Sequence, residues 1–196
     1  MNMTRSKKKD LLYVAVAAFF FLTACVLQTV DDYISDWSVK KTIALLTQYI
    51  FFGLLAYWTA SVISRISDKS ICSGIIVAIA LMGVILFVRL LKYHVFYDGT
   101  VMRYLWYSYY IPHCLAPAFL LITLLGMGRK DGKPLAKGWY LLFLPAAALI
   151  LLVFTNDLHE QVFSFAKGLK YSNEIYKWEW GYYFILSWIA VLYLSI

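Results

Sequence analysis

Charged residues and cysteines are both scarce in this chain of 196 residues. Only 15% of the residues are charged, whereas 62% are hydrophobic, well above the roughly 45–50% that is usual in soluble domains. This balance excludes an ordinary soluble domain and indicates a membrane protein. The three cysteines, Cys25, Cys72 and Cys114, lie inside apolar runs without paired spacing. They argue against a disulfide framework or a metal site, and we expect free, packed thiols.

Strict alternation of apolar and polar residues, which a membrane β-barrel requires, is also absent. Long apolar runs are present instead, and a helical span needs about 20 such residues. We therefore predict an all-α, multi-pass transmembrane helical bundle that forms one domain over residues 1–196. About six spans are expected, of which the last two are short, at residues 11–30, 42–63, 71–91, 104–127, 139–155 and 180–196.

The first apolar run has a second interpretation. Its basic start and the sequence "LTAC" ending at Cys25 resemble a bacterial lipoprotein signal. Such signals normally deliver a soluble domain, but five more apolar segments follow here, so a membrane span is the favoured interpretation.

Prolines in two of the expected spans and the longest loop each predict a local departure from straight transmembrane helices. Pro112 and Pro117 in the fourth expected span, and Pro145 in the fifth, each remove a backbone donor and predict kinks there. The longest loop, residues 156–179, contains "HEQVFSFAKGL", for which we expect an interfacial amphipathic helix. In that helix Val162, Phe163 and Phe165 would contact lipid.

The distribution of basic residues predicts the orientation of the chain. If the N-terminus is cytoplasmic, ten Lys and Arg residues and three acidic residues lie inside, against eight of each outside. The net charge of +7 then lies wholly on the cytoplasmic side, as the positive-inside rule requires. We predict a bacterial inner-membrane protein with a cytoplasmic N-terminus, the lipid bilayer as partner and no nucleic acid. The basic stretch 128–139, "GRKDGKPLAKGW", is interpreted as a solvated loop near anionic lipid.

In this orientation the remaining polar side chains gather at the outer face, where they indicate a ligand site. Trp106, Tyr110 and His113 follow helical spacing and share one face of the fourth span. The predicted ligand-binding residues are Arg103, Tyr107, Tyr110, His113, Asn156, Asp157 and His159. The expected ligand is an unknown small molecule or lipid, held in a pocket with aromatic walls.

The aromatic residues and His113 also have structural explanations that involve no ligand. Trp and Tyr collect at membrane interfaces because their rings are amphipathic. His113 lies roughly 13 Å deep, from a rise of about 1.5 Å per residue. At that depth it either faces a cavity or packs against a backbone carbonyl that a proline has freed.

Catalysis is not expected from this chain. "HEQVF" at His159 begins like a zinc-protease signature, but Phe163 stands where the second histidine ligand is required. The sequence also contains no glycine-rich phosphate loop. We therefore predict no catalytic residue, metal or cofactor. A small multi-pass transporter or channel is the alternative to a ligand-binding receptor.

Two stretches carry a family resemblance. "RYLWYSYYIPHCLAPAFLL" at 103–121 and "LLVFTNDLHEQVFSF" at 151–165 resemble the N-terminal seven-span membrane region of certain bacterial sensor histidine kinases. In that family an apolar span ends in Thr-Asn, here Thr155 and Asn156, and a Leu-His pair and an aromatic patch follow. The likeness is best over residues 103–190.

The resemblance implies a sensor module for signal transduction, which passes a signal to a cytoplasmic kinase or other effector in cis or in trans. A second copy of the chain, in a homodimer, is a further candidate partner. Two departures are present: members of the family often carry a second histidine where this chain has Glu160, and six spans are found instead of seven. The chain contains no phosphoacceptor histidine box or ATP-binding region, so it is not itself a kinase.

Overall fold

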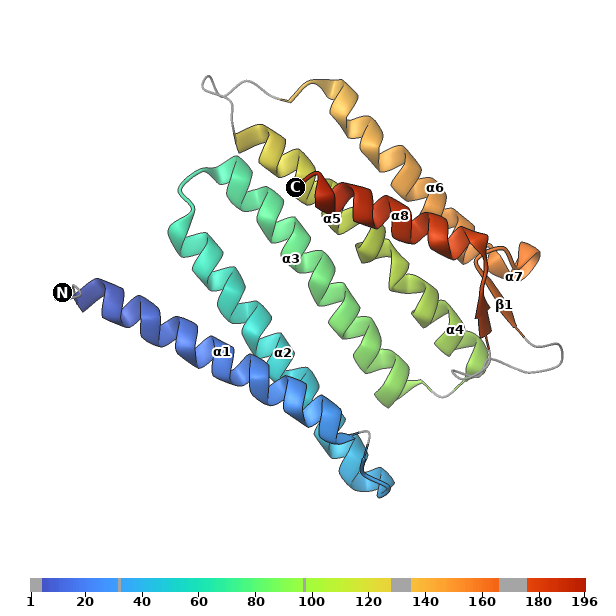
Figure 1. Ribbon diagram of the computed structural model, residues 1–196, viewed down its shortest axis with the longest axis horizontal. Helices are drawn as coiled ribbons and strands as arrows, with labels where there is room; N and C mark the ends of the chain where they lie inside the picture. Colours follow the sequence, from blue (N-terminus) through green and yellow to red (C-terminus); the bar gives the residue numbers. More distant parts are fainter. Residues whose placement is uncertain (1–4, 32, 97, 128–134, 166–175) are drawn as a thin grey trace. The chain divides into compact units, whose positions relative to one another are not determined.

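Helices dominate the structure, a computed structural model that describes residues 5–31, 33–96, 98–127, 135–165 and 176–196 (Figure 1). Within these described residues, five apolar segments are long enough to cross a bilayer: Tyr13–Val30, Trp37–Arg65, Lys69–Val95, Gly99–Met127 and Lys137–Phe154. The sixth expected span, Trp180–Leu194, is apolar but has only 15 residues, fewer than the 20 or so that span a bilayer. The all-α class is confirmed, with five long candidate spans and one short one.

Residue contacts divide the chain into two compact units, residues 1–61 and 62–196, where the sequence predicted one domain. The first unit contains α1 (Arg5–Asp31) and most of α2 (Trp37–Arg65). Asp36 caps α2 by accepting hydrogen bonds from the N–H groups of Ser38 and Val39.

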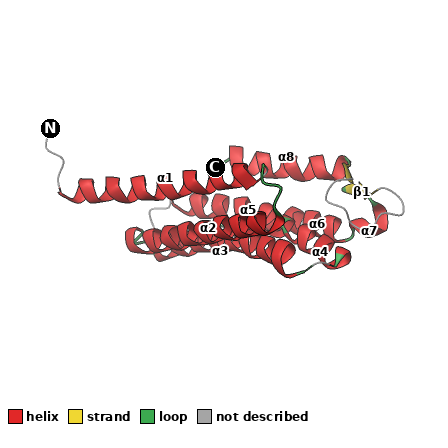
Figure 2. Ribbon diagram, turned by 90° about the horizontal axis from the view of Figure 1, so that it is seen from below, coloured by secondary structure: helices red, strands yellow, loops and turns green. Residues whose placement is uncertain are grey.

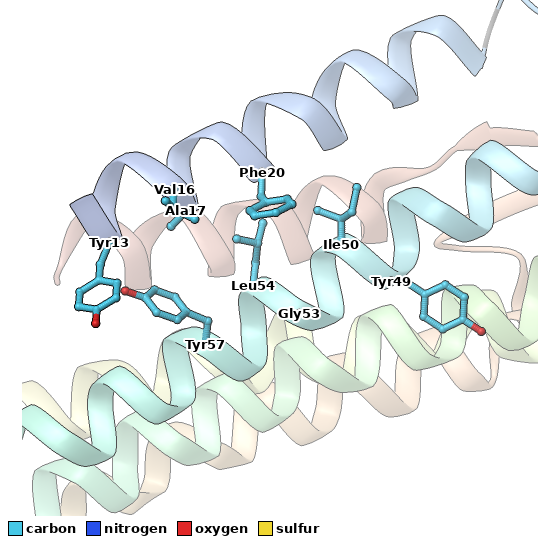
Figure 3. A pocket seen from close by; sticks show the side chains of 9 residues that line it. All are labelled: Tyr13, Val16, Ala17, Phe20, Tyr49, Ile50, Gly53, Leu54 and Tyr57. Atoms are coloured by element: carbon cyan, nitrogen blue, oxygen red, sulfur yellow. The ribbon is translucent and has the colours of Figure 1, made fainter. Parts of the chain in front are cut away.

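The two helices of the first unit enclose an apolar cavity. Its volume is about 450 Å³, and it is lined by Tyr13, Val16, Ala17, Phe20, Tyr49, Ile50, Gly53, Leu54 and Tyr57 (Figure 3). The rings of Tyr13 and Tyr57 lie 6.5 Å apart, which pairs the start of α1 with the later part of α2. These helices are therefore antiparallel.

The second unit contains the end of α2 and every later element. Its helices are α3 (Lys69–Leu90), the π-helical turn η1 (Leu91–Val95), α4 (Gly99–Ser108), α5 (Tyr110–Met127), the 3₁₀ helix η2 (Lys137–Leu142), α6 (Phe143–Phe154), α7 (Asn156–His159) and α8 (Trp180–Leu194). Its strands are β1 (Phe163–Phe165) and β2 (Tyr176–Trp178). Asp68 and Asp98 cap α3 and α4 through their carboxylates.

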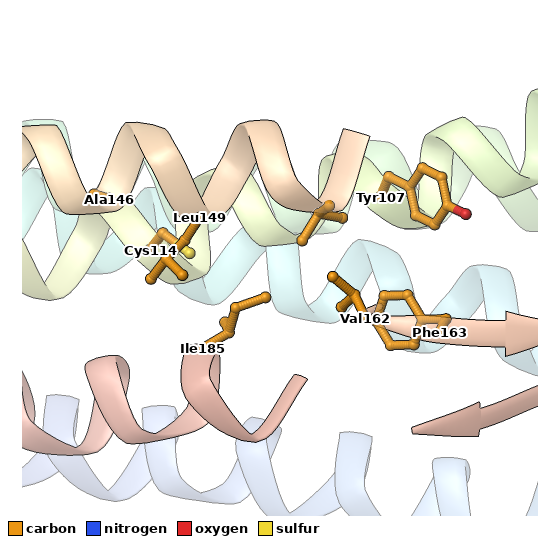
Figure 4. Packing of buried hydrophobic residues seen from close by; sticks show 8 residues of the cluster. Tyr107, Cys114, Ala146, Leu149, Val162, Phe163 and Ile185 are labelled. Atoms are coloured by element: carbon orange, nitrogen blue, oxygen red, sulfur yellow. The ribbon is translucent and has the colours of Figure 1, made fainter. Parts of the chain in front are cut away.

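Helix α5 lies at the centre of this unit and packs against α3, α6 and α8. The view of Figure 2 shows α8 lying over the layer that α3 to α6 form. The main core cluster joins these elements through Tyr107, Cys114, Ala146, Leu149, Val153, Val162, Phe163 and Ile185 (Figure 4). The thiols of all three cysteines are free.

The prolines interrupt the helices close to where the sequence predicted kinks. Pro112 cannot donate to the carbonyl of Ser108, and α4 ends at Ser108, with α5 beginning at Tyr110. Pro117 stays inside α5. Pro145 lies in the first turn of α6, directly after the change from 3₁₀ to α geometry at Leu142.

The loop after α6 differs from the interfacial helix expected in "HEQVFSFAKGL". Phe163–Phe165 form strand β1, which pairs antiparallel with Tyr176–Trp178. Val162 and Phe163 are fully buried instead of facing lipid, because they pack into the core cluster against Tyr107 and Ile185. Residues 166–169 of this stretch, and Arg129, Lys130 and Lys133 of the basic stretch, lie outside the described residues.

Candidate functional site

The elements that carry the polar side chains expected at the outer face converge at one end of the second unit. Figure 1 shows the ends of α3 and α6, the start of α4, the β-hairpin and the start of α8 at that end. Four of the predicted site residues form one hydrogen-bonded polar network, which consists of Arg103, Tyr107, Asn156 and Asp157.

Asn156 is the centre of the polar network and is fully buried. Its Oδ1 accepts hydrogen bonds from the backbone N–H groups of Val162 and Phe163, at 2.9 and 3.0 Å. Its Nδ2 donates to the Phe163 carbonyl at 2.8 Å and to the Tyr107 hydroxyl at 3.2 Å. One side chain therefore satisfies three backbone groups at the start of β1 and joins the hairpin to α4.

Asp157 joins α7 to α4. Its Oδ1 accepts a hydrogen bond from the Tyr107 hydroxyl at 2.7 Å and lies 3.1 Å from Nη1 of Arg103. The Arg103 guanidinium also lies over the Phe165 ring, 4.5 Å from its centroid, an arrangement that favours a cation. The charges of Arg103 and Asp157 thus compensate each other beside the hairpin.

His159 holds the turn that follows α7. Its Nδ1 accepts from the backbone N–H of Gln161 at 3.0 Å, and its Nε2 lies 3.2 Å from Oγ1 of Thr155. Glu160, next in the chain, has a left-handed backbone with φ 50°, which ends the helix. His159 therefore positions a tight turn between the short helix and β1.

A separate cavity lies beside the polar network, and we call it the aromatic pocket. Its volume is about 520 Å³, and its lining residues are Ile85, Arg89, Tyr93, Trp106, Tyr109, Tyr110, His113, Tyr182, Leu186 and Ile189. Of the predicted site residues, Tyr110 and His113 line it. Arg103, Tyr107, Asn156, Asp157 and His159 are not among the lining residues.

His113 is held by its own helix. Its Nδ1 contacts the backbone carbonyl of Tyr109. Because a carbonyl only accepts, Nδ1 carries a proton and donates to it. His113 lines a cavity, as one of the two alternatives expected. The carbonyl that its ring contacts is not one that a proline has freed, because the Tyr109 carbonyl also accepts from the backbone N–H of His113 at 3.3 Å.

Trp106 joins the aromatic pocket to the hairpin. It lines the pocket, and its ring lies 4.4 Å from the Phe163 ring and 4.8 Å from the Tyr176 ring, centroid to centroid. Tyr182 of α8 plays a similar part, because its ring lies 4.5 Å from that of Trp178. A change in the pocket can thus reach the β-hairpin through the ring contacts of these two residues.

Several lining residues were not predicted as binding residues from the sequence. Arg89 was expected at the outer face, and Ile85 lies one helical turn before it. Only the tertiary structure shows that residues of α8 line the same cavity.

Lys92 was expected in an open loop and is instead 3% exposed, in the π-helical turn η1. Its Nζ lies 5.0 Å from the Tyr93 ring centroid and 6.0 Å from that of Trp106.

The fold and the pocket together define a helical membrane protein with a ligand-sized cavity at one end. No protein-family model, curated protein or solved structure matches the chain at a significant level. Among the described residues, no group of three His, Cys, Asp or Glu side chains has a geometry that would hold a metal ion. The function is therefore inferred from the pocket and the polar network.

A double-mutant cycle on Tyr107 and Asp157 tests the polar network. We expect Tyr107→Phe and Asp157→Asn each to lower the free energy of unfolding by about 1–2 kcal/mol, because the first removes their partly buried hydrogen bond and the second weakens it by removing the charge of the acceptor. The two effects should couple by about 1 kcal/mol, since they act on the same bond. The measurement is unfolding of the purified chain in mixed micelles by titration with dodecyl sulfate, followed by circular dichroism.

Tyr104→Phe is the matched control for this cycle. Tyr104 lies on the same helix and is 42% exposed, so loss of its hydroxyl should change the free energy of unfolding by less than about 0.5 kcal/mol. Strict additivity of Tyr107→Phe and Asp157→Asn would contradict the network.

Proposed function

We propose that this chain is a membrane-embedded receptor module of a bacterial signalling protein, and that its ligand binds in the aromatic pocket. The observation that carries the proposal is the origin of the lining residues, which come from α3, η1, α4, α5 and α8. A ligand in contact with all of these elements favours one arrangement of them over another. Such differential affinity is what a conformational signal requires.

The dimensions of the pocket support ligand binding. A volume of about 520 Å³ falls within the roughly 300–1,000 Å³ of small-molecule sites. Its lining is mostly aromatic and aliphatic, with a few polar groups that can orient a ligand, namely Arg89, His113 and the tyrosine hydroxyls. This is the usual composition of a binding site.

The connection from the pocket to α8 supports signal transfer. Trp106 and Tyr182 contact the β-hairpin, and the hairpin is bound to the start of α8 by backbone hydrogen bonds from Glu179 to Val162 and from Gly181 to Gln161, both 3.0 Å. The polar network holds the other side of the same hairpin. A ligand that displaces Trp106 or Tyr182 would therefore shift α8 relative to α4.

The orientation and the output belong to the same proposal. The positive-inside distribution supports a cytoplasmic N-terminus, and in that orientation the aromatic pocket would lie at the outer face of a bacterial inner membrane. The resemblance to sensor histidine kinases supports a cytoplasmic kinase or other effector as the output, in cis or in trans.

In intact cells, a maleimide that cannot cross the membrane should label Leu158→Cys in a cysteine-free background, and no labelling would contradict the orientation.

Thermal unfolding of the purified chain, titrated with fractionated bacterial membrane and culture-medium extracts, tests the receptor proposal. A ligand at 100 times its Kd adds about 2.7 kcal/mol, and each kcal/mol raises the Tm by about 2–4 °C for a chain of this size. We expect one fraction to raise the Tm by about 5–10 °C. Leu186→Trp should abolish the shift, because Leu186 is 43% exposed and lines the pocket, so that the indole fills it at little cost to folding.

Leu194→Trp is the matched control, because Leu194 lies on the same helix, is 88% exposed and is not a lining residue. It should retain the full Tm shift. The active fraction is also tested for flux in proteoliposomes: absence of flux fits a receptor, whereas flux that Leu186→Trp blocks would favour the small transporter or channel. If no fraction shifts the Tm, or if Leu186→Trp leaves the shift intact, the receptor proposal fails.

A further inference from the structure

We propose that the aromatic pocket binds a membrane amphiphile with an anionic head group, which Arg89 holds, and with an apolar chain against Ile85, Leu186 and Ile189. This inference rests on the proposed function, because it specifies the chemical class of the ligand for the same pocket. It follows from the charge of the lining, from the order of polar and apolar residues along it, and from the opening that the helices leave between α3 and α8.

The charge of the lining is positive. Arg89 is exposed, and among the described residues it forms neither an ion pair nor a hydrogen bond. No Asp or Glu is among the lining residues. Arg103, at the same end of the unit, is by contrast compensated by Asp157. Arg89 therefore offers a guanidinium to an anion, and the planar fork of that group suits phosphate and carboxylate oxygens.

The lining changes from polar to apolar along the helix axes. On α3, Ile85 precedes Arg89 by one turn, about 6 Å at 1.5 Å per residue. On α8, Tyr182 is followed inward by Leu186 and then by Ile189. Arg89 and Tyr182 both lie near the hairpin end of their helices. A ligand that matches this order has its charge at that end and its apolar part deeper.

The helices leave the pocket open between α3 and α8. Both helices pack against α5, but they make no extensive contact with each other. Trp106, Tyr109, Tyr110 and His113, from α4, α5 and the residue between them, form the floor of a groove whose walls are α3 and α8. An opening of this kind between two apolar helices admits an acyl chain sideways.

Two sources share this ligand chemistry: an acidic phospholipid and a free long-chain carboxylate. Both pair with Arg89 by charge-assisted hydrogen bonds. Arg89 is the one arginine or lysine among the lining residues, and its guanidinium is always charged, so the proposal assigns the anion to Arg89. The experiment therefore compares phosphate, carboxylate and zwitterionic head groups on the same type of chain.

The test is quenching of tryptophan fluorescence by lipids with brominated chains, using the full chain in nanodiscs of unbrominated phosphatidylcholine. The probes are brominated phosphatidylglycerol, brominated stearate and brominated phosphatidylcholine. The signal of Trp106, which lines the pocket, is taken as the difference between the native chain and Trp106→Phe. We expect saturable quenching by one or both anionic probes at about ten-fold lower concentration than by the zwitterionic probe.

Arg89→Gln should weaken quenching by the anionic probes about ten-fold, because it removes the charge that pairs with the head group. Lys177→Gln is the matched control, because it removes one exposed cation from the same end of the unit, in β2, outside the pocket lining. It should leave the concentration dependence within about two-fold. Tighter binding of phosphatidylglycerol identifies a phospholipid as the source, and tighter binding of stearate identifies a free carboxylate.

Equal quenching by all three probes, or an unchanged response in Arg89→Gln, would overturn the assignment of an anionic amphiphile. Quenching that Leu186→Trp does not reduce would also overturn it, because the lipid would then contact Trp106 from outside the pocket. The receptor proposal survives these results if a fraction of the extracts still raises the Tm in a manner that Leu186→Trp abolishes. The two proposals can therefore fail separately.

Discussion

Asn156→Ala should lower the free energy of unfolding by about 4 kcal/mol. The substitution removes the partner of four groups: the N–H of Val162, the N–H and carbonyl of Phe163, and the hydroxyl of Tyr107. Val162, Phe163 and Tyr107 are all fully buried, and an unsatisfied buried polar group costs about 1–3 kcal/mol. Part of the loss is recovered where the Tyr107 hydroxyl keeps its bond to Asp157.

Titration with dodecyl sulfate, read by circular dichroism and tryptophan fluorescence, measures the effect of Asn156→Ala. Leu158→Ala is the matched control in the same short helix, because Leu158 is 87% exposed and should change the free energy by less than about 0.5 kcal/mol. A loss below about 1 kcal/mol for Asn156→Ala would show that other groups or water replace its hydrogen bonds. The prediction would then be wrong.

Gly74→Ala should lower the free energy of unfolding by about 2 kcal/mol. A Cβ at Gly74 would lie 2.0 Å from Oγ1, 2.8 Å from Cγ2 and 2.9 Å from Cβ of Thr123. Thr123 cannot simply rotate away, because its hydroxyl is bonded to the Phe119 carbonyl at 2.7 Å and its own Cβ would still be too close. α3 and α5 must therefore separate, and such overpacking costs about 1–3 kcal/mol.

Gly126→Ala is the matched control for the contact between α3 and α5. Gly126 lies on α5, and a Cβ there meets no atom within 4 Å. That substitution should be neutral or should stabilise the chain by up to about 1 kcal/mol, because alanine is the better helix former. Adding Thr123→Ala to Gly74→Ala should restore part of the loss. If Gly74→Ala and Gly126→Ala have equal effects, the close approach of the two helices is wrong.

The local sequence predicted much of the secondary structure, and particular residues show why. Asp98 caps α4 by accepting hydrogen bonds from the N–H groups two and three positions after it, and Pro112 ends the same helix at Ser108. Both interactions span at most four positions of the chain, so the sequence alone contains both partners. The expected interfacial helix was different: Phe163–Phe165 pair with Tyr176–Trp178, and a pattern of apolar residues does not specify a strand partner that far along the chain.

The candidate site was only partly predictable for a related reason. The sequence placed Arg103, Asn156, Asp157 and His159 near each other at one end, and the structure places them there. It predicted all seven site residues as ligand-binding residues, whereas the structure divides them between a polar network, a turn and the pocket. Arg89, Tyr93 and Tyr109 line the pocket although none was predicted as a binding residue.

The sequence by itself determined that this chain forms apolar helices of membrane length, because helices satisfy their own backbone groups and their hydrogen bonds join near neighbours. The tertiary structure alone decided which side chains meet. Arg103 reaches Asp157 across 54 positions, and Arg89 shares a cavity with Tyr182. Those pairings depend on how far each helix is rotated and shifted against α5, which the sum of many packing contacts sets and no local pattern encodes.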